Sequence, residues 1–302
     1  MPRPYLLQLA SADTPQYLEF VPALTEAYNA LWAAELPTSL LVDVAHCAFL
    51  APGHLVALAC LVDFYQLRGI EVSMSLSENE AHDYLARIRF FDYWQSGFDR
   101  RRYTPNQLDT NLCLWQVDGQ MIDAYAHQAK AYFAQNFLPD KNLDVLHTSL
   151  AELFNNICDH AQSPVQGYCF TQYYPKRQQL VTAVCDFGMG IPASINRLWQ
   201  AKGRRGLPDA DALRAALRRR VTTQSTPRNR GFGLDSLATS TRSMQGELTF
   251  VSNFALLEQL ATGEIVTKNP SCFFPGTLIV VTLNTATLPA VEEESEVDEF
   301  SF

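Results

Sequence analysis

In the first hundred residues, segments with the hydrophobic pattern of a strand alternate with segments that have the pattern of a helix. Short runs that are continuously apolar or alternate with period two predict strands, and apolar positions three and four residues apart predict helices. The predicted strands are 5–9, 39–44 and 70–76, and the predicted helices are 17–36, 52–67 and 78–94. Strands that alternate with helices are typical of a small α/β domain.

The second half of the chain has a different order of elements. Helical spacing covers 118–137 and resumes near 143, and two strands joined by a Pro-Lys-Arg turn then predict a hairpin. The predicted strands are 166–174, 179–185, 247–252 and 277–283, and the later helices are 192–202, 210–221 and 235–244. This order indicates a larger domain in which helices cover a sheet.

The polar segment 97–111 separates the two patterns. We therefore predict domains at 1–103 and 104–290, followed by an acidic tail at 291–302. Three consecutive arginines at 100–102 are either an anion site or part of a solvated linker.

Composition narrows the class of protein. The chain has 302 residues, 47% of them hydrophobic, and no apolar run approaches the roughly 20 residues that span a bilayer. The N-terminus lacks a signal-peptide pattern, so we expect a soluble, cytoplasmic protein. The seven cysteines are odd in number and never form CxxC, which predicts buried reduced thiols.

Charge is distributed unevenly. The formal net charge of −9 argues against general nucleic-acid binding, because such binding rests on neutralising phosphates. However, residues 193–230 contain nine arginines and one lysine against Asp209 and Asp211, while 292–299 contain six acids. We expect the basic segment to face an anion and the tail to be solvated and disordered.

Candidate chemistry begins on the helix that contains HTSLAELFNNICDHA. Glu152, Asn156, Asp159 and His160 share one stripe of this helix beside an apolar stripe. Burying a carboxylate or an amide there costs free energy unless a ligand, metal or partner satisfies it.

Two glycine pairs follow. Asp186 ends a strand and leads into the sequence Gly188-Met-Gly190, where two glycines permit a tight backbone turn. A second pair, Gly231 and Gly233, opens the helix at 235–244. Backbone N–H groups at a helix start favour phosphate oxygens.

These motifs in this order, ExxxNxxDHA, DFGMGIP, a basic stretch, RGFGL and PGT, resemble the GHKL ATPase superfamily over residues 144–284. The resemblance implies the Bergerat ATP-binding fold, an α+β two-layer sandwich with a mixed sheet and helices on one face. It implies ATP and Mg²⁺ as ligands. The closest motif match is to the anti-sigma-factor kinases.

The resemblance also assigns roles to residues near the base and the metal. Asn156 matches the asparagine that holds Mg²⁺, with Asn155 as a second choice of register. Asp186 matches the aspartate that accepts a hydrogen bond from the adenine amino group, and Thr277 matches the threonine that supports it through water. The glycine turn, with Gly188, Gly190 and Ile191, would lie against the base.

Further roles concern the phosphates. The resemblance implies that the turn Gly231-Phe232-Gly233-Leu234 receives them and that 193–230 forms a lid, with Arg228 and Arg230 as the nearest cations. Glu152 matches the carboxylate that orients and deprotonates the attacking water. Asp159 and His160 belong to the same site, and His160 is open between support and catalysis.

Residues 39–76 resemble a STAS domain, the fold of anti-sigma-factor antagonists. Pro52 occupies the position of the serine that those proteins phosphorylate, which leaves a docking or scaffolding role. An ordinary α/β layer without a partner is the alternative.

These inferences together predict a Mg-ATP-binding regulatory protein. Its nucleotide-dependent lid would control a protein partner docked on the STAS-like domain, with slow hydrolysis. The alternatives are a serine/threonine kinase that acts on a partner and an interaction module with an inactive nucleotide site. A homodimer remains open, and neither membrane nor direct nucleic-acid binding is expected.

Overall fold

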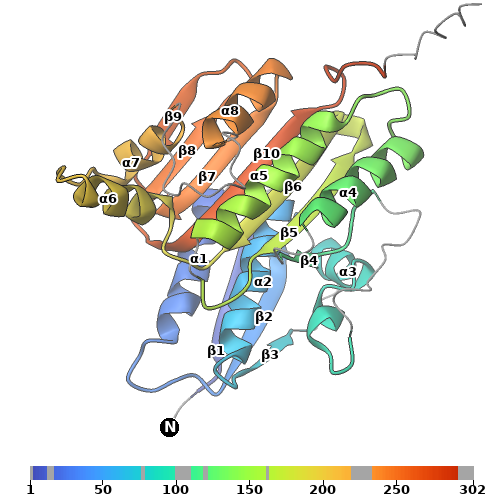
Figure 1. Cartoon of the computed structure of the whole chain (residues 1–302). Helices are drawn as coiled ribbons and strands as arrows, with labels where there is room; N and C mark the ends of the chain where they lie inside the picture. Colours follow the sequence, from blue (N-terminus) through green and yellow to red (C-terminus); the bar gives the residue numbers. More distant parts are fainter. Residues whose placement is uncertain are drawn as a thin grey trace, which may run out of the picture.

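The computed structural model describes residues 3–11, 17–75, 79–98, 110–117, 122–160, 163–218 and 233–291, with the backbone only at 11, 17–18 and 156–160. Within these residues the chain is a mixed α/β protein with two sheets (Figure 1). The predicted class of mixed helix and sheet is therefore confirmed.

The N-terminal part forms a three-stranded parallel sheet in the order β1-β2-β3. Its elements are β1 (Tyr5–Ser11), α1 (Tyr17–Ala30), β2 (Ser39–Cys47), α2 (Pro52–Gln66), β3 (Glu71–Met74), α3 (Glu80–Arg87) and the short helix η1 (Phe91–Trp94). The predicted alternation of strands and helices is confirmed here, since helices α1 and α2 connect the parallel strands.

The rest of the chain forms a seven-stranded sheet in the order β4-β5-β6-β10-β7-β8-β9. Its strands are β4 (Trp115–Gln116), β5 (Tyr168–Tyr174), β6 (Gln179–Asp186), β7 (Glu247–Asn253), β8 (Ala255–Gln259), β9 (Ile265–Lys268) and β10 (Phe274–Asn284). All neighbouring pairs are antiparallel, so the expectation of a mixed sheet was wrong. The reason is that hairpins connect β5 to β6, β7 to β8 and β8 to β9, and β10 then enters between β6 and β7.

Five helices pack on one face of this sheet (Figure 1). They are α4 (Ile122–Asn136), α5 (Asp144–His160), α6 (Ile191–Ala201), α7 (Asp209–Ala216) and α8 (Leu234–Ser243). Leu150, Leu153 and Phe154 anchor α5 on the core of this face, as its apolar stripe predicted.

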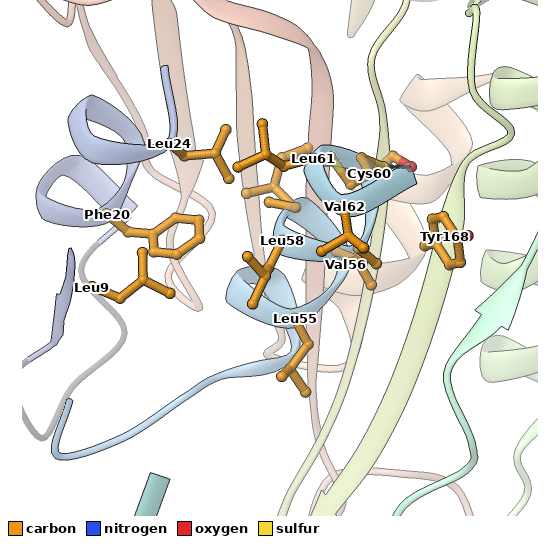
Figure 2. Packing of buried hydrophobic residues seen from close by; sticks show 14 of the residues in the cluster. Leu9, Phe20, Leu24, Leu55, Val56, Leu58, Cys60, Leu61, Val62 and Tyr168 are labelled. Carbon is orange, nitrogen blue, oxygen red and sulfur yellow. Dashed lines mark hydrogen bonds between the residues drawn. The ribbon is translucent and has the colours of Figure 1, made fainter. Parts of the chain in front are cut away.

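The opposite face of the large sheet is covered by α2. Every residue from Pro52 to Tyr65 is buried, because α2 lies between the small sheet and strands β5, β6 and β10. Figure 2 shows Leu58 directed toward Phe20 of α1, and Val56 on the side of Tyr168 of β5. The described helices of the C-terminal part thus lie on one face of the sheet, as expected, and the other face is covered by α2 of the N-terminal part, which is apolar all round and covered on both sides.

A polar cluster fixes α2 against the large sheet. The carboxylate of Asp63 accepts hydrogen bonds from Trp94 Nε1 at 2.6 Å, Tyr168 OH at 2.6 Å and Gln116 Nε2 at 3.1 Å. A buried carboxylate with several donors is stably held. This cluster, together with a core shared by both sheets, joins the two parts, and the limits 1–103 and 104–290 stay a prediction.

Two composition-based expectations can be compared with the structure. The prediction of buried free thiols is confirmed at Cys47, Cys60, Cys113, Cys169 and Cys185, whereas the free thiol of Cys272 is only partly buried. Among the described residues, helices of the length and apolarity needed to cross a membrane do not occur.

Candidate functional site

Three polar side chains form a row across the end of the large sheet. Thr277 of β10 lies directly opposite Asp186 of β6 on one side and Ser252 of β7 on the other. Their exposures are 6%, 4% and 0%. Directly paired residues of antiparallel strands share a face, and the next residues in each strand belong to the core around α2. The polar row therefore faces the layer of α5 and α8.

Asp186 is the most unusual group of the row. Its burial raises the pKa of the carboxyl to about 7, and the hydrogen bond from Gly188 N to Oδ1 at 2.8 Å opposes this rise. Within the part of the chain that the structure describes, Oδ2 accepts no hydrogen bond. A carboxylate on a residue this deeply buried, with a single donor, is costly to ionise, and a ligand that supplies a second donor would lower that cost.

Ser252 connects the row to the neighbouring backbone. Its hydroxyl donates to the carbonyl oxygen of Gly276 at 2.7 Å and accepts from Ile191 N, the first residue of α6, at 3.0 Å. Its oxygen lies 3.1 Å from Thr277 Oγ1. The start of α6 and the start of β10 are thus held by one side chain.

Two glycines are required by the close approach of backbone segments. Gly190, at φ 81°, would place a Cβ 2.6 Å from the side chain of Asn253. At Gly276, with φ 113°, a Cβ would overlap the carbonyl oxygen of Asp186 and the backbone of the glycine turn. Asn253 also donates to the carbonyl oxygen of Met189 at 3.3 Å. The DFGMG turn is therefore packed on the start of β10, where the PGT sequence lies at an irregularity in the pairing with β7.

The helix that carries the candidate catalytic residue ends at the same end of the sheet. Helix α5 packs on β6 and α8, and its last residues, the end of β6 and the start of β10 lie together at the lower left of the large sheet (Figure 1). Glu152 is half-buried about two turns before the end of α5. The backbone positions of Asn156, Asp159 and His160 follow it toward this end, and their side chains are outside the description.

The predicted phosphate turn is described only at its end. Gly233 is the residue before α8, and Leu234, the first of the helix, is buried. Arg228, Arg230, Gly231 and Phe232 lie outside the described residues. The sequence-predicted residues that the structure brings together are therefore Asp186, Gly188, Gly190, Ile191 and Thr277.

The predicted lid 193–230 needs a correction. Its described part, 193–218, contains most of α6 and all of α7, and Ile195, Ala212 and Leu213 are buried in the core beside the large sheet. These two helices pack on the core through their apolar faces, and residues 219–230 of the predicted lid lie outside the described residues. Their cations lie on the opposite faces, with Arg197, Arg204 and Arg214 exposed.

Phe187 joins the glycine turn to the N-terminal part. Since it follows Asp186, its side chain points to the opposite face of the sheet. There its ring centroid lies 5.5 Å from that of Tyr28 of α1 and 6.1 Å from that of Phe64 of α2. Asp186 and Gly188, on either side of it, form the turn at the polar row. A shift of this turn would therefore reach α1 and α2 directly.

The sequence reasoning missed Ser252, Asn253 and Phe187 as parts of the site. Ser252 ends the predicted strand 247–252, and pairing this strand with 277–283 would have placed it opposite Thr277. Asn253 has φ 51°, a left-handed conformation that asparagine tolerates, and it makes the tight turn into β8.

The row offers hydrogen-bond acceptors in a dry setting, next to a helix start. Such a set suits a ligand edge that carries N–H donors. Groups of three or more histidine, cysteine or acidic residues that could hold a metal do not occur among the described residues. No protein-family model and no curated protein matches this chain.

Proposed function

We propose that this protein binds Mg-ATP at the end of the large sheet and acts as a regulatory protein of the GHKL type. The observation that carries the proposal is the Asp186 carboxyl, a residue 4% exposed whose Oδ2 lacks a donor among the described residues and which lies beside Thr277 and the glycine turn. The order of the sequence motifs adds to this support.

Base recognition would use the polar row. The amino group of adenine would donate to Asp186, and the ionised carboxylate is the better acceptor. Gly190 allows the turn to lie close to Asn253. Because Gly188 and Gly190 have no side chains, the turn would face the base mainly with its backbone. Burial excludes water, so each hydrogen bond to the base contributes more than it would at the surface.

Phosphate binding would use the start of α8 and the end of α5. Backbone N–H groups after Gly233 point along the positive end of the ten-residue helix. Asn156 would hold Mg²⁺, an ion that usually takes only one or two protein ligands and would offset the negative charge of the phosphates. Glu152 would orient a water for slow hydrolysis.

Regulation would pass to the N-terminal part. The contacts of Phe187 with Tyr28 and Phe64 support a connection between nucleotide state and this part. We propose that the N-terminal part is STAS-like and docks a protein partner. Since α2 is enclosed, its docking surface must lie elsewhere, and Trp32, at 64% exposure, and Leu67 are exposed apolar candidates.

The proposal is tested by measuring ATP affinity in the presence of Mg²⁺ by calorimetry. We expect micromolar to millimolar binding by the wild type. Asp186→Asn should weaken binding about tenfold or more, because a charge-assisted hydrogen bond is worth roughly 1.5–3 kcal/mol. Asn156→Ala should weaken binding of Mg-ATP but not of ATP without the metal.

Asp140→Asn is the matched control. This exposed acid lies beside Val291, beyond the far end of β10, and should leave affinity unchanged. Equal ATP affinity in the wild type and in both site variants would sink the proposal, as would a wild type that binds no ATP. Phosphate release measured in the same samples, with Glu152→Ala, separates hydrolysis from binding alone.

A further inference from the structure

The numbers of donors and acceptors around Ser252 determine the direction of the Thr277 hydroxyl proton. A serine hydroxyl has one proton and two lone pairs. The carbonyl oxygen of Gly276 can only accept, so the proton of Ser252 is used in that bond. The N–H of Ile191 can only donate, so it takes one lone pair of Ser252.

The remaining contact of Ser252 is with Thr277 Oγ1 at 3.1 Å. Since Ser252 has no second proton, Thr277 must be the donor in this contact. The Thr277 hydroxyl proton therefore points along the sheet toward β7, away from Asp186 on the other side. Its lone pairs then remain without a donor, because the described residues supply no other donor to Thr277.

Asp186 presents an acceptor at the neighbouring position. Its Oδ1 is used by Gly188 N, and Oδ2 has no donor from the described residues. Asp186 and Thr277 are direct cross-strand neighbours, so their side chains are about 5 Å apart at Cβ. The row thus offers two adjacent acceptors to one ligand edge.

We propose that Ser252 is a positioning residue that makes this site selective for a ligand edge with an exocyclic amino group. It does so by fixing the Thr277 hydroxyl as an acceptor beside the Asp186 carboxylate. An amino group carries two N–H donors and can satisfy both acceptors. A carbonyl at the same place would meet two acceptors and be rejected.

The inference rests on the proposed nucleotide site and concerns its choice between bases. ATP and inosine triphosphate differ at the relevant atom, because hypoxanthine carries a carbonyl where adenine carries the amino group. Without Ser252, the Thr277 hydroxyl can rotate and donate its proton to that carbonyl. The preference for ATP should then fall.

The experiment measures the ratio of the dissociation constants for ATP and inosine triphosphate in wild type, Ser252→Ala, Thr277→Val and the double variant. We expect Ser252→Ala to reduce the preference for ATP about tenfold, mainly through tighter binding of inosine triphosphate. In the Thr277→Val background, Ser252→Ala should leave the ratio unchanged, because Ser252 acts through the missing hydroxyl. Thr277→Ser keeps a hydroxyl and should keep the preference.

Ser149→Ala is the control for the loss of a buried serine hydroxyl. Ser149, on α5, is buried, and its hydroxyl has no hydrogen-bond partner among the described residues. It should leave the ratio as in the wild type. If Ser252→Ala unfolds the protein, Thr277→Val against Thr277→Ser still tests the hydroxyl.

The outcomes separate the two proposals. A wild type that binds neither nucleotide overturns the nucleotide site itself. A wild type that binds ATP but keeps the same ratio in Ser252→Ala overturns the role of Ser252 alone. An additive effect of Ser252→Ala in the Thr277→Val background also overturns it, since a purely structural role would give that result.

Discussion

The two faces of the seven-stranded sheet are built from the same strands but differ in what they leave unsatisfied. Toward α2, residues such as Cys185, Phe187 and Leu278 form a closed core, and the polar Asp63 there receives several donors. Toward α5 and α8, the neighbouring residues Asp186 and Thr277 are as deeply buried, yet they keep acceptors without donors among the described residues. The first face is a core whose polar groups are satisfied, and the second is the face on which we propose that a ligand binds.

The largest effect is expected where the polar row meets the glycine turn. Gly276→Ala would place a Cβ on the carbonyl oxygen of Asp186 at a φ of 113°. The free energy of unfolding should fall by more than about 4 kcal/mol, because backbone must move. Chemical denaturation measures it.

Gly203→Ala is the control for conformation alone. Gly203 also has positive φ, at 68°, but no atom lies within 4 Å of an added Cβ. It should cost about 1–2 kcal/mol. A similar loss of unfolding free energy at both glycines would show that β10 does not pack closely on the glycine turn after Asp186.

Substitutions at two neighbouring residues of β10 test whether side chains are packed on both faces of the large sheet. Leu278 points to α2 and Ile279 to α5, and both are buried. Leu278→Ala and Ile279→Ala should each lower the free energy of unfolding by about 3 kcal/mol. A much smaller loss for Leu278→Ala would mean that α2 does not cover the sheet in solution.

A pH profile tests the unsatisfied acid. The folded pKa of Asp186, about 7, lies above the ordinary 3.8, so the folded state takes up a proton. This contribution to stability is complete below pH 4 and is lost as pH rises to 7. Without nucleotide, Asp186→Asn should therefore be more stable than the wild type at pH 8, by an amount that reaches about 4 kcal/mol if the whole shift is recovered. The difference should shrink as pH falls from 7 to 4, and a constant difference would contradict the raised pKa.

The smallest change in stability is expected at Asp63, the hydrogen-bonded carboxylate on the α2 face of the sheet. Tyr168→Phe removes one donor to Asp63 and should cost about 1.5 kcal/mol, the value of a hydrogen bond to a charged group. Tyr125→Phe is the control, since the buried Tyr125 hydroxyl accepts a weak hydrogen bond from the Cys169 thiol at 3.8 Å and does not donate to Asp63. Equal costs for the two variants would argue against a special role for the Asp63 cluster. Thermal unfolding resolves the difference.

Much of the site could be predicted from local sequence. The strand that ends at Asp186 and the turn through Gly188 and Gly190 follow from apolar periodicity and glycine spacing, which need no distant partner. The helix predicted from near 143 begins at Asp144 for the same reason. In contrast, β8 and β9 were missed, because they are short and their pairing depends on the tight turn at Asn253.

Helices α6 and α7 show a second limit of prediction from sequence. The arginines of 193–218 suggested a mobile cover, because charge is visible in a sequence and the surface that a helix buries is not. Only the fit of Ala212 and Leu213 against the sheet shows that α7 belongs to the core.

The sequence by itself determined the elements, their order, the turn chemistry and the candidate acceptors, because these depend on residues close together in the chain. Tertiary structure decided that α2 lies between two sheets and that Ser252 stands beside Thr277. Both facts depend on contacts between distant segments, where pairing across strands sets which side chains meet. The proton arrangement in the polar row is therefore visible only after β6, β10 and β7 are placed side by side.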